Sequence, residues 1–156
     1  MCLYKIEFYN FKLRNNSKVS KVNLSYQIFG KPISTAPLVI VNHALTGNSQ
    51  VTDNDGWWQS LIGSNKIINT NKYAVLAFNI PGNGFRDEDN LIDNYNDFTT
   101  FDIANLFWKG LDSLNVQEVF AVIGGSLGGA IAWEMAAIRP NGIQNLIPIA
   151  TSWKSS

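Results

Sequence analysis

Apolar and polar residues alternate in two segments near the start of the chain. The first reads KIEFYNFKLR (residues 5–14), the second reads KVNLSYQIFG (residues 21–30), and the turn-rich stretch NNSK follows the first. Alternation with a period of two is typical of strands that bury one face, and Asn and Ser favour turns. The pattern therefore predicts a β-hairpin over residues 5–30.

Apolar residues run almost without interruption in four later segments. These segments read PLVIVN (37–42), YAVLAFNI (73–80), VFAVIG (119–124) and LIPIA (146–150). Such runs are typical of strands covered on both faces, as in a parallel sheet. The sequence therefore predicts a sheet buried between two layers.

Helical spacing of apolar residues appears between these runs. In segment 99–115 apolar residues recur at spacings of three and four, and Thr99 with Asp102 fits a capping box at its start. A second helix is expected over 127–139, because Pro140 prevents its continuation. Alternation of strands and helices predicts an α/β fold with a three-layer, mostly parallel sheet. We expect one domain over residues 1–156, with its sheet and helix core at 37–150.

Composition narrows the class of protein. The chain has 156 residues, 46% of them hydrophobic and 15% charged, with 12 basic and 12 acidic residues. A balanced charge argues against nucleic acid as a partner. The single cysteine, Cys2, excludes an internal disulfide and a thiolate zinc site. We see no secretory leader and no apolar run of about 18 residues that could span a membrane, so a cytoplasmic location is expected.

A serine among glycines marks the first chemical motif. Gly124, Gly125, Ser126, Leu127 and Gly128 follow a buried strand and open a helix. This is the G-x-S-x-G pattern of a nucleophile elbow, in which a tight turn exposes the serine hydroxyl and glycines avoid collisions. The free N–H groups of the helix N-terminus favour developing negative charge. We predict that Ser126 is a nucleophile; the alternative is an ordinary turn whose serine caps the helix.

The other glycine motifs do not fit this stretch. A dinucleotide fingerprint needs G-x-G-x-x-G, and a phosphate-binding P-loop needs a lysine directly after its last glycine. Counting from Gly124 places Ser126 where the fingerprint requires glycine, and Ala130 follows Gly129. The nucleophile interpretation therefore remains the favoured one.

The segment HALTG (43–47) follows the buried run PLVIVN. A serine nucleophile needs two N–H donors for the oxyanion that forms during acyl transfer. One donor comes from the residue after the serine, and the other comes from a loop after an earlier strand. HALTG lies where that loop is expected.

Five segments follow one another along the chain and read VNHALTGNS, GWWQSLIG, INTNKY, NIPGNG and IGGSLGGAIAWEMA. Together they resemble the homoserine O-acetyltransferase family of α/β-hydrolase-fold enzymes. The resemblance implies that Ser126 is the nucleophile and that the backbone N–H groups of Leu45 and Leu127 form the oxyanion hole. It also implies an acetyl transfer from acetyl-CoA, a co-substrate and not a bound cofactor, to L-homoserine in methionine biosynthesis. A homodimer is the expected form of the full-length protein.

Two features depart from this family. The loop NIPGNGFRDEDN (79–90) stands where typical members carry a glycine-rich segment that ends in a serine-threonine-glycine-proline-like run, which leaves the acyl group and the acceptor open. No histidine or aspartate follows Ser126, and Glu134 is the only acid there, although the triad partners follow the serine in this fold. We therefore expect that the chain is the N-terminal portion of a longer enzyme, without the lid, the C-terminal strands and the triad Asp and His. We expect this chain to be inactive in isolation. A serine esterase or hydrolase of the same fold, or a non-catalytic α/β module, stays an alternative.

Several other residues have side chains that could take part in chemistry. His43 is the only histidine; we interpret it as a residue that positions the HALTG loop with Thr46 and Gly47, with a catalytic base as the alternative. The acidic stretches DNDG (53–56) and RDEDN (86–90) lack the spacing of a calcium loop, so no metal site is predicted. Trp57 and Trp58 are expected on a helix that packs against the sheet, with a ligand-stacking platform as the alternative. Trp108 and Trp133 are expected to fill the core or the space between the helices.

Overall fold

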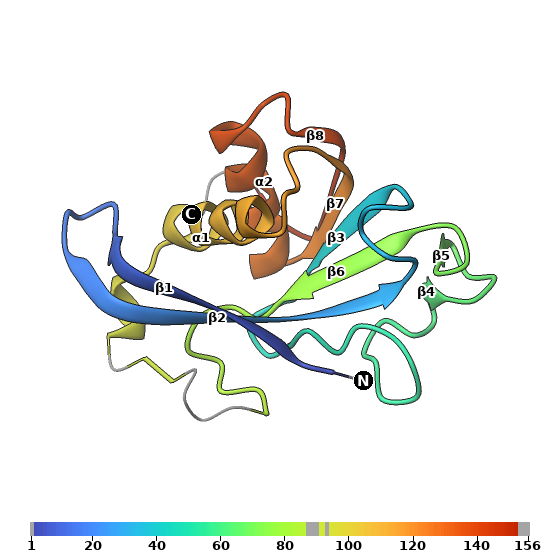
Figure 1. Ribbon diagram of the computed structural model, residues 1–156, viewed down its shortest axis with the longest axis horizontal. Coiled ribbons are helices and arrows are strands. Elements are labelled where there is room, and N and C mark those ends of the chain that lie inside the picture. Colours follow the sequence, from blue (N-terminus) through green and yellow to red (C-terminus); the bar gives the residue numbers. More distant parts are fainter. Residues whose placement is uncertain (1, 87–90, 93, 153–156) are drawn as a thin grey trace.

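A six-stranded sheet forms the centre of the molecule, with its strands in the order β1-β2-β6-β3-β7-β8 (Figure 1). The structure is a computed structural model, and it describes residues 2–86, 91–92 and 94–152. The strands are β1 (Tyr4–Lys12), β2 (Lys18–Gly30), β3 (Leu38–Asn42), β6 (Ala74–Phe78), β7 (Val119–Gly125) and β8 (Ile143–Ile149). The pairs β1–β2 and β2–β6 are antiparallel, and the other three pairs are parallel. The predicted hairpin and the mostly parallel sheet are therefore confirmed.

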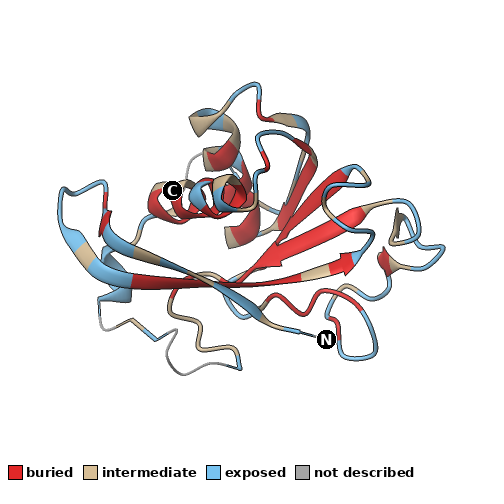
Figure 2. Ribbon diagram, viewed as in Figure 1, coloured by how far each residue is buried: buried red, intermediate tan, exposed pale blue. Residues whose placement is uncertain are grey.

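The central strands are buried on both faces, as their continuous apolar runs predict (Figure 2). In β3, Leu38 and Ile40 pack into the core under the helices, whereas Val39 and Val41 pack into a second core on the opposite face. This alternation follows from the period-two pleat of a strand. Both faces of β3 therefore lie away from solvent.

Two helices, α1 (Thr100–Ser113) and α2 (Leu127–Ile138), cover one face of the sheet (Figure 1). The predicted capping box at α1 is present: the Thr99 side chain accepts from the Asp102 N–H, and the Asp102 carboxylate accepts from the Thr99 N–H at 3.0 Å. Trp108 is buried, as expected, and its indole N–H donates to the Met135 carbonyl at 2.9 Å. That bond fixes α1 against α2.

The opposite face carries turns and two short strands, β4 (Ile62–Gly63) and β5 (Ile68–Asn69), which the sequence did not predict. The helix expected at Trp57 and Trp58 is wrong, because both residues lie in turns. Their backbone N–H groups donate to Gln50 and Val51 of the preceding loop, and not to carbonyls one helical turn earlier. Trp58 still packs against the second core. A loop thus covers this face.

The connection between β6 and α1 holds a short 3-10 helix, η2 (Tyr95–Asp97). Over the residues that the structure describes, neither α1 nor α2 has the length and apolar character needed to cross a membrane. The C-terminal ends of the parallel strands β3, β6 and β7 lead into the loops that carry the predicted site residues. In open α/β sheets, ligands bind at this edge.

Candidate active site

Ser126 lies at a sharp turn between β7 and α2 with φ 53° and ψ −119°. A positive φ is uncommon for a residue with a Cβ and costs free energy that the surrounding structure must offset. The Ser126 N–H donates to the Ile149 carbonyl at 2.9 Å, and its own carbonyl accepts from Gly129 at 3.0 Å. The residue is exposed, and its hydroxyl makes no capping hydrogen bond. The Ser126 hydroxyl therefore does not cap α2, which removes the capping part of the alternative interpretation.

Two of the predicted glycines make this turn possible. A Cβ at Gly124 would overlap the carbonyl of Gly128, and a Cβ at Gly128 would overlap the backbone carbonyl of Asn42. Both collisions are with backbone atoms, so α2 can approach β7 and β3 this closely only with glycine at both positions. At Gly125 the nearest atom to an added Cβ is Trp58 Cζ2 at 3.9 Å, an ordinary contact. The structure thus separates two sterically required glycines from one that is not.

The HALTG segment forms a turn at the end of β3. The Gly47 N–H donates to the Ala44 carbonyl at 2.9 Å, and Leu45 and Thr46 at the tip are exposed. A Cβ at Gly47 would lie 2.8 Å from His43 Cβ, so the turn closes tightly over the histidine. This turn brings Leu45 to the N-terminus of α2.

Leu45 and Leu127 line the same cavity, of about 370 Å³. In the described part of the chain, neither backbone N–H donates a hydrogen bond to the backbone or to a side chain. Because Leu127 directly follows Ser126, its N–H belongs to the free donors of the α2 N-terminus, where negative charge is favoured. The two residues predicted to form an oxyanion hole therefore meet beside the serine with unused donors.

His43 is fully buried and both of its ring nitrogens are engaged. Nε2 accepts from the Ile80 N–H at 3.0 Å, and Nδ1 lies 2.7 Å from the Ala44 carbonyl. An acceptor at Nε2 requires the neutral tautomer that carries its proton on Nδ1, which donates to that carbonyl. Burial lowers the pKa of His43, against a smaller raising effect of the Ala44 hydrogen bond. This arrangement favours the positioning role over the catalytic base, since neither nitrogen is free to take a proton.

A buried network of polar side chains holds the residues that directly follow the HALTG segment. The Asn79 carbonyl oxygen Oδ1 accepts from the Ser49 N–H at 2.7 Å, and its amide donates to the Ser25 hydroxyl at 2.8 Å. The Ser49 hydroxyl donates to Gln27 Oε1 at 2.7 Å, and the Gln27 amide donates to Gln50 Oε1 at 3.1 Å. All five residues are buried. The network joins β2 and the end of β6 to the residues that follow HALTG.

Sequence reasoning missed this network. One signal was present: Asn79 lies inside the apolar run 73–80, whereas Gln27 falls among the polar positions of an alternating strand. Buried polar side chains are normally hydrogen-bonded, so polar residues inside apolar runs indicate such partners.

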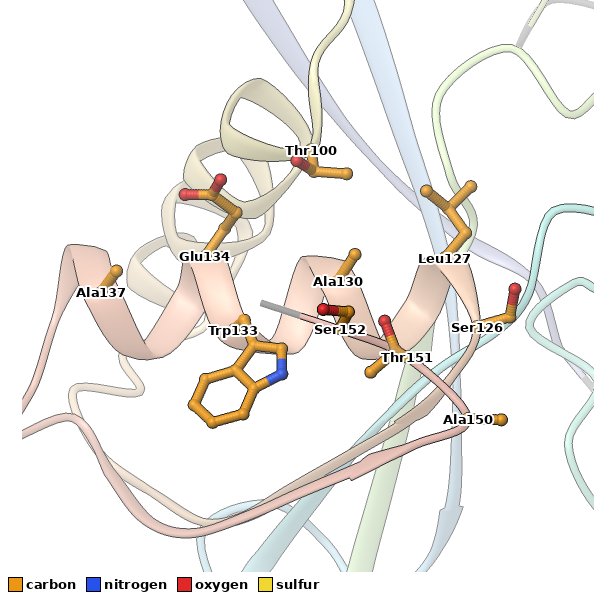
Figure 3. Close-up of a pocket in the computed structure, with 10 residues that line it drawn as sticks. All are labelled: Thr100, Ser126, Leu127, Ala130, Trp133, Glu134, Ala137, Ala150, Thr151 and Ser152. Carbon is orange, nitrogen blue, oxygen red and sulfur yellow. The ribbon is translucent and has the colours of Figure 1, made fainter. Parts of the chain in front are cut away.

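Ser126 also opens onto a larger hollow of about 750 Å³ along α2 (Figure 3). Thr151 and Ser152 run beside the helix, and Trp133 and Glu134 project from opposite sides of it (Figure 3). Trp133 is 39% exposed, so the expectation that it fills the space between the helices is wrong. The Glu134 carboxylate is directed away from Ser126 (Figure 3). Glu134 is therefore not placed to act as an acidic partner of Ser126 in this structure.

No group of three or more His, Cys, Asp or Glu side chains that could hold a metal ion occurs among residues 2–86, 91–92 and 94–152. The stretch DNDG (53–56) forms part of a loop, with the Gly56 N–H donating to the Asp53 carbonyl. Residues 87–90 of the second acidic stretch lie outside the described residues.

Comparison with known proteins identifies what this arrangement resembles. The family model for the alpha/beta hydrolase fold matches residues 37–156. The homoserine O-acetyltransferase of Methanococcus vannielii is 35% identical over 92% of this chain and 33% of its own length. The enzyme of the same name from Corynebacterium diphtheriae is 30% identical over 94% of this chain and 41% of its own length. The chain thus spans a third to two-fifths of these relatives.

Solved structures agree with this result. A homoserine O-acetyltransferase from Staphylococcus aureus superposes with a TM-score of 0.84 and 27% identity, over 99% of this chain and 48% of that one. The acetyl esterase MekB gives a TM-score of 0.84 at 18% identity over 100% of this chain and 46% of that one, a likeness of fold. The resemblance to homoserine O-acetyltransferases that the motifs indicated is confirmed at the level of sequence. The chain belongs to the alpha/beta hydrolase fold family.

Proposed function

We propose that the protein that carries this chain is an acyltransferase that moves an acetyl group from acetyl-CoA to the hydroxyl of L-homoserine, a step of amino-acid biosynthesis. The observation that carries the proposal is the exposed Ser126 at a strained turn, next to the unused N–H groups of Leu45 and Leu127. The relatives named homoserine O-acetyltransferase support homoserine as the acceptor and acetyl as the group that is moved.

Acyl transfer through a serine divides the reaction into two steps. Ser126 Oγ bonds to the thioester carbonyl carbon, the carbon–sulfur bond breaks, and the hydroxyl proton leaves with the thiol. The homoserine hydroxyl oxygen then bonds to the same carbon, the bond to Oγ breaks, and the proton returns to the serine. In both steps the carbonyl oxygen becomes negative, and the N–H groups of Leu45 and Leu127 stabilise it.

The proton in these steps needs a base other than His43, whose ring nitrogens are both engaged. We propose that the rest of the protein supplies the base, its acidic partner and the contacts of the expected homodimer. The activity therefore belongs to the protein expressed from its whole reading frame.

The test is acetyl transfer by that protein with acetyl-CoA and L-homoserine, followed by mass spectrometry of product and enzyme. We expect O-acetylhomoserine and an acetylated Ser126 peptide. The Ser126→Ala variant should lose about 10⁴-fold or more in kcat. Ser113→Ala is the matched control, because its hydroxyl is exposed on α1 and donates to the Lys109 carbonyl.

The outcomes separate the candidate functions. Release of acetate in place of O-acetylhomoserine would identify the hydrolase alternative of the same fold. Unchanged transfer in Ser126→Ala would refute the nucleophile, and no reaction with a folded protein would favour the non-catalytic module.

A further inference from the structure

The cavity beside the oxyanion residues is small, apolar and distinct from the hollow along α2. Its lining is mostly apolar and comes from Leu45, Ile80, Pro81, Phe98, Ile103 and Leu127, while Asn83, Tyr95 and Thr100 are its polar side chains. These residues belong to the loops after β3 and β6, to the start of α1 and to the start of α2. Only Leu127 and Thr100 line both spaces. The elbow therefore separates two sites of different character.

A tetrahedral carbon on Ser126 carries an acyl substituent and a leaving or attacking group, which point in different directions. The hollow of about 750 Å³ holds Glu134, Thr151 and Ser152, so it suits the larger polar group. The cavity of about 370 Å³ adjoins both oxyanion residues and suits a small hydrocarbon group. Apolar walls favour an apolar substituent, because its transfer from water is favourable.

Among the residues that the structure describes, the side chains that line this cavity offer no positive charge to pair with an anion. Asn83 is already engaged, since its amide donates to Asn79 and its oxygen accepts from the Phe85 N–H. The N-terminus of α1, beside Thr100, is capped by the Asp102 carboxylate. No charged residue lines the cavity among the residues that the structure describes. An anionic acyl group such as succinyl would lie there without a cationic partner against mostly apolar walls, which is costly.

We propose that this cavity, hereafter the acyl cavity, binds the hydrocarbon part of an uncharged acyl group and has room for chains longer than acetyl. The assignment of its ligand class rests on the proposed function, which supplies the acyl group and the oxyanion residues. A methyl group occupies about as much space as a water molecule, about 30 Å³, and the cavity holds about 370 Å³. Acyl chains up to butyryl or longer therefore fit.

The test uses uncharged amides as stand-ins for the acyl group, so that binding is measured without catalysis. The protein, expressed from its whole reading frame with isotope-labelled isoleucine and leucine methyl groups, is titrated with acetamide, propionamide, butyramide and hexanamide. We expect NMR shifts at the methyl groups of Ile80, Ile103 and Leu127. Affinity should rise about fourfold for each added CH₂ until the cavity is full. Succinamate, which carries a carboxylate, should bind at least about tenfold more weakly than butyramide.

Ile80→Phe and Ile33→Phe form a matched pair. Both isoleucines are partly buried against the same core, but Ile33 lines a separate space near β3 and the end of α1. Ile80→Phe fills the acyl cavity and should abolish the gain with chain length, whereas Ile33→Phe should preserve it. If Ile80→Phe does not fold, the titration of the native protein decides by itself.

Three results would overturn the inference: equal affinity for all amides, shifts at Ile33 as large as those at Ile80, or preferred binding of succinamate. These results are independent of the proposed function. Acetyl transfer to homoserine without amide binding would refute the acyl cavity alone. Amide binding with the expected chain-length gain, in a protein that does not transfer acetyl groups, would refute the transferase alone.

Discussion

Three glycines around Ser126 give a sharp test of how the elbow is built. Gly124, Gly125 and Gly128 each change to alanine, one at a time. An added Cβ at Gly124 meets the backbone of Gly128 and Gly129, and one at Gly128 meets the backbone carbonyls of Asn42 and His43. Flexible side chains can move away from such a contact, but backbone held by a sheet and a helix moves only if the elements separate.

The magnitudes follow from these contacts. Overpacking against rigid atoms costs about 1–3 kcal/mol, and the backbone collisions place Gly124→Ala at the upper end, about 3 kcal/mol. Gly128→Ala gains about 1 kcal/mol of helix propensity, which leaves a net loss of about 2 kcal/mol. Gly125→Ala adds a methyl 3.9 Å from its nearest neighbour at a φ that is not positive. Its stability should stay within about 0.5 kcal/mol of the native value or rise slightly.

Urea denaturation, followed by circular dichroism and tryptophan fluorescence, measures the free energy of unfolding of each variant. The expected order of stability is native and Gly125→Ala, then Gly128→Ala, then Gly124→Ala. Equal losses at all three positions would refute the steric account, because Gly125 has space for the added methyl. A Gly124→Ala protein as stable as the native one would show that α2 does not approach β7 as described.

Two further predictions concern buried residues that hold the HALTG turn and the residues after it. Because burial lowers the pKa of His43 from 6.5, the unfolded chain binds a proton more readily than the folded one. The contribution of neutral His43 to the free energy of unfolding is therefore complete above pH 6.5, and below pH 6.5 it falls by up to about 1.4 kcal/mol per pH unit. Urea titrations from pH 8 to pH 5 measure this fall. A His43→Gln variant whose free energy of unfolding falls equally with pH would contradict the prediction. Asn79→Ala leaves the Ser49 N–H without its buried acceptor and should cost about 2–3 kcal/mol in the same assay. Asn145→Ala, at an exposed amide that donates to the Phe120 carbonyl, is the control and should cost less than about 1 kcal/mol; equal losses would contradict the burial argument.

Much of the fold could be read from local pattern. Period-two alternation and continuous apolar runs predict the hairpin and the buried strands, because the side chains of a strand alternate between its two faces. Thr99 and Asp102 predicted the start of α1 because a capping box involves only neighbouring residues. The helix expected at Trp57 failed for the opposite reason. There the backbone N–H groups bond to a loop that precedes them, a partner that no local pattern reveals.

The spacing of Gly124 and Gly128 around Ser126 also predicted a tight strand-to-helix turn, because it indicates which positions must lack a Cβ. Only the tertiary structure showed which backbone atoms would collide with a Cβ at Gly124 or Gly128, and that Gly125 has space for one. It also showed that Leu45 and Leu127 line the same cavity. It also decided the role that His43 can play, because its partner Ala44 lies in the loop after β3 and its partner Ile80 lies in the loop after β6. Residue types and spacing fix what a group can do, whereas contacts between distant segments depend on how the sheet brings its strand ends together.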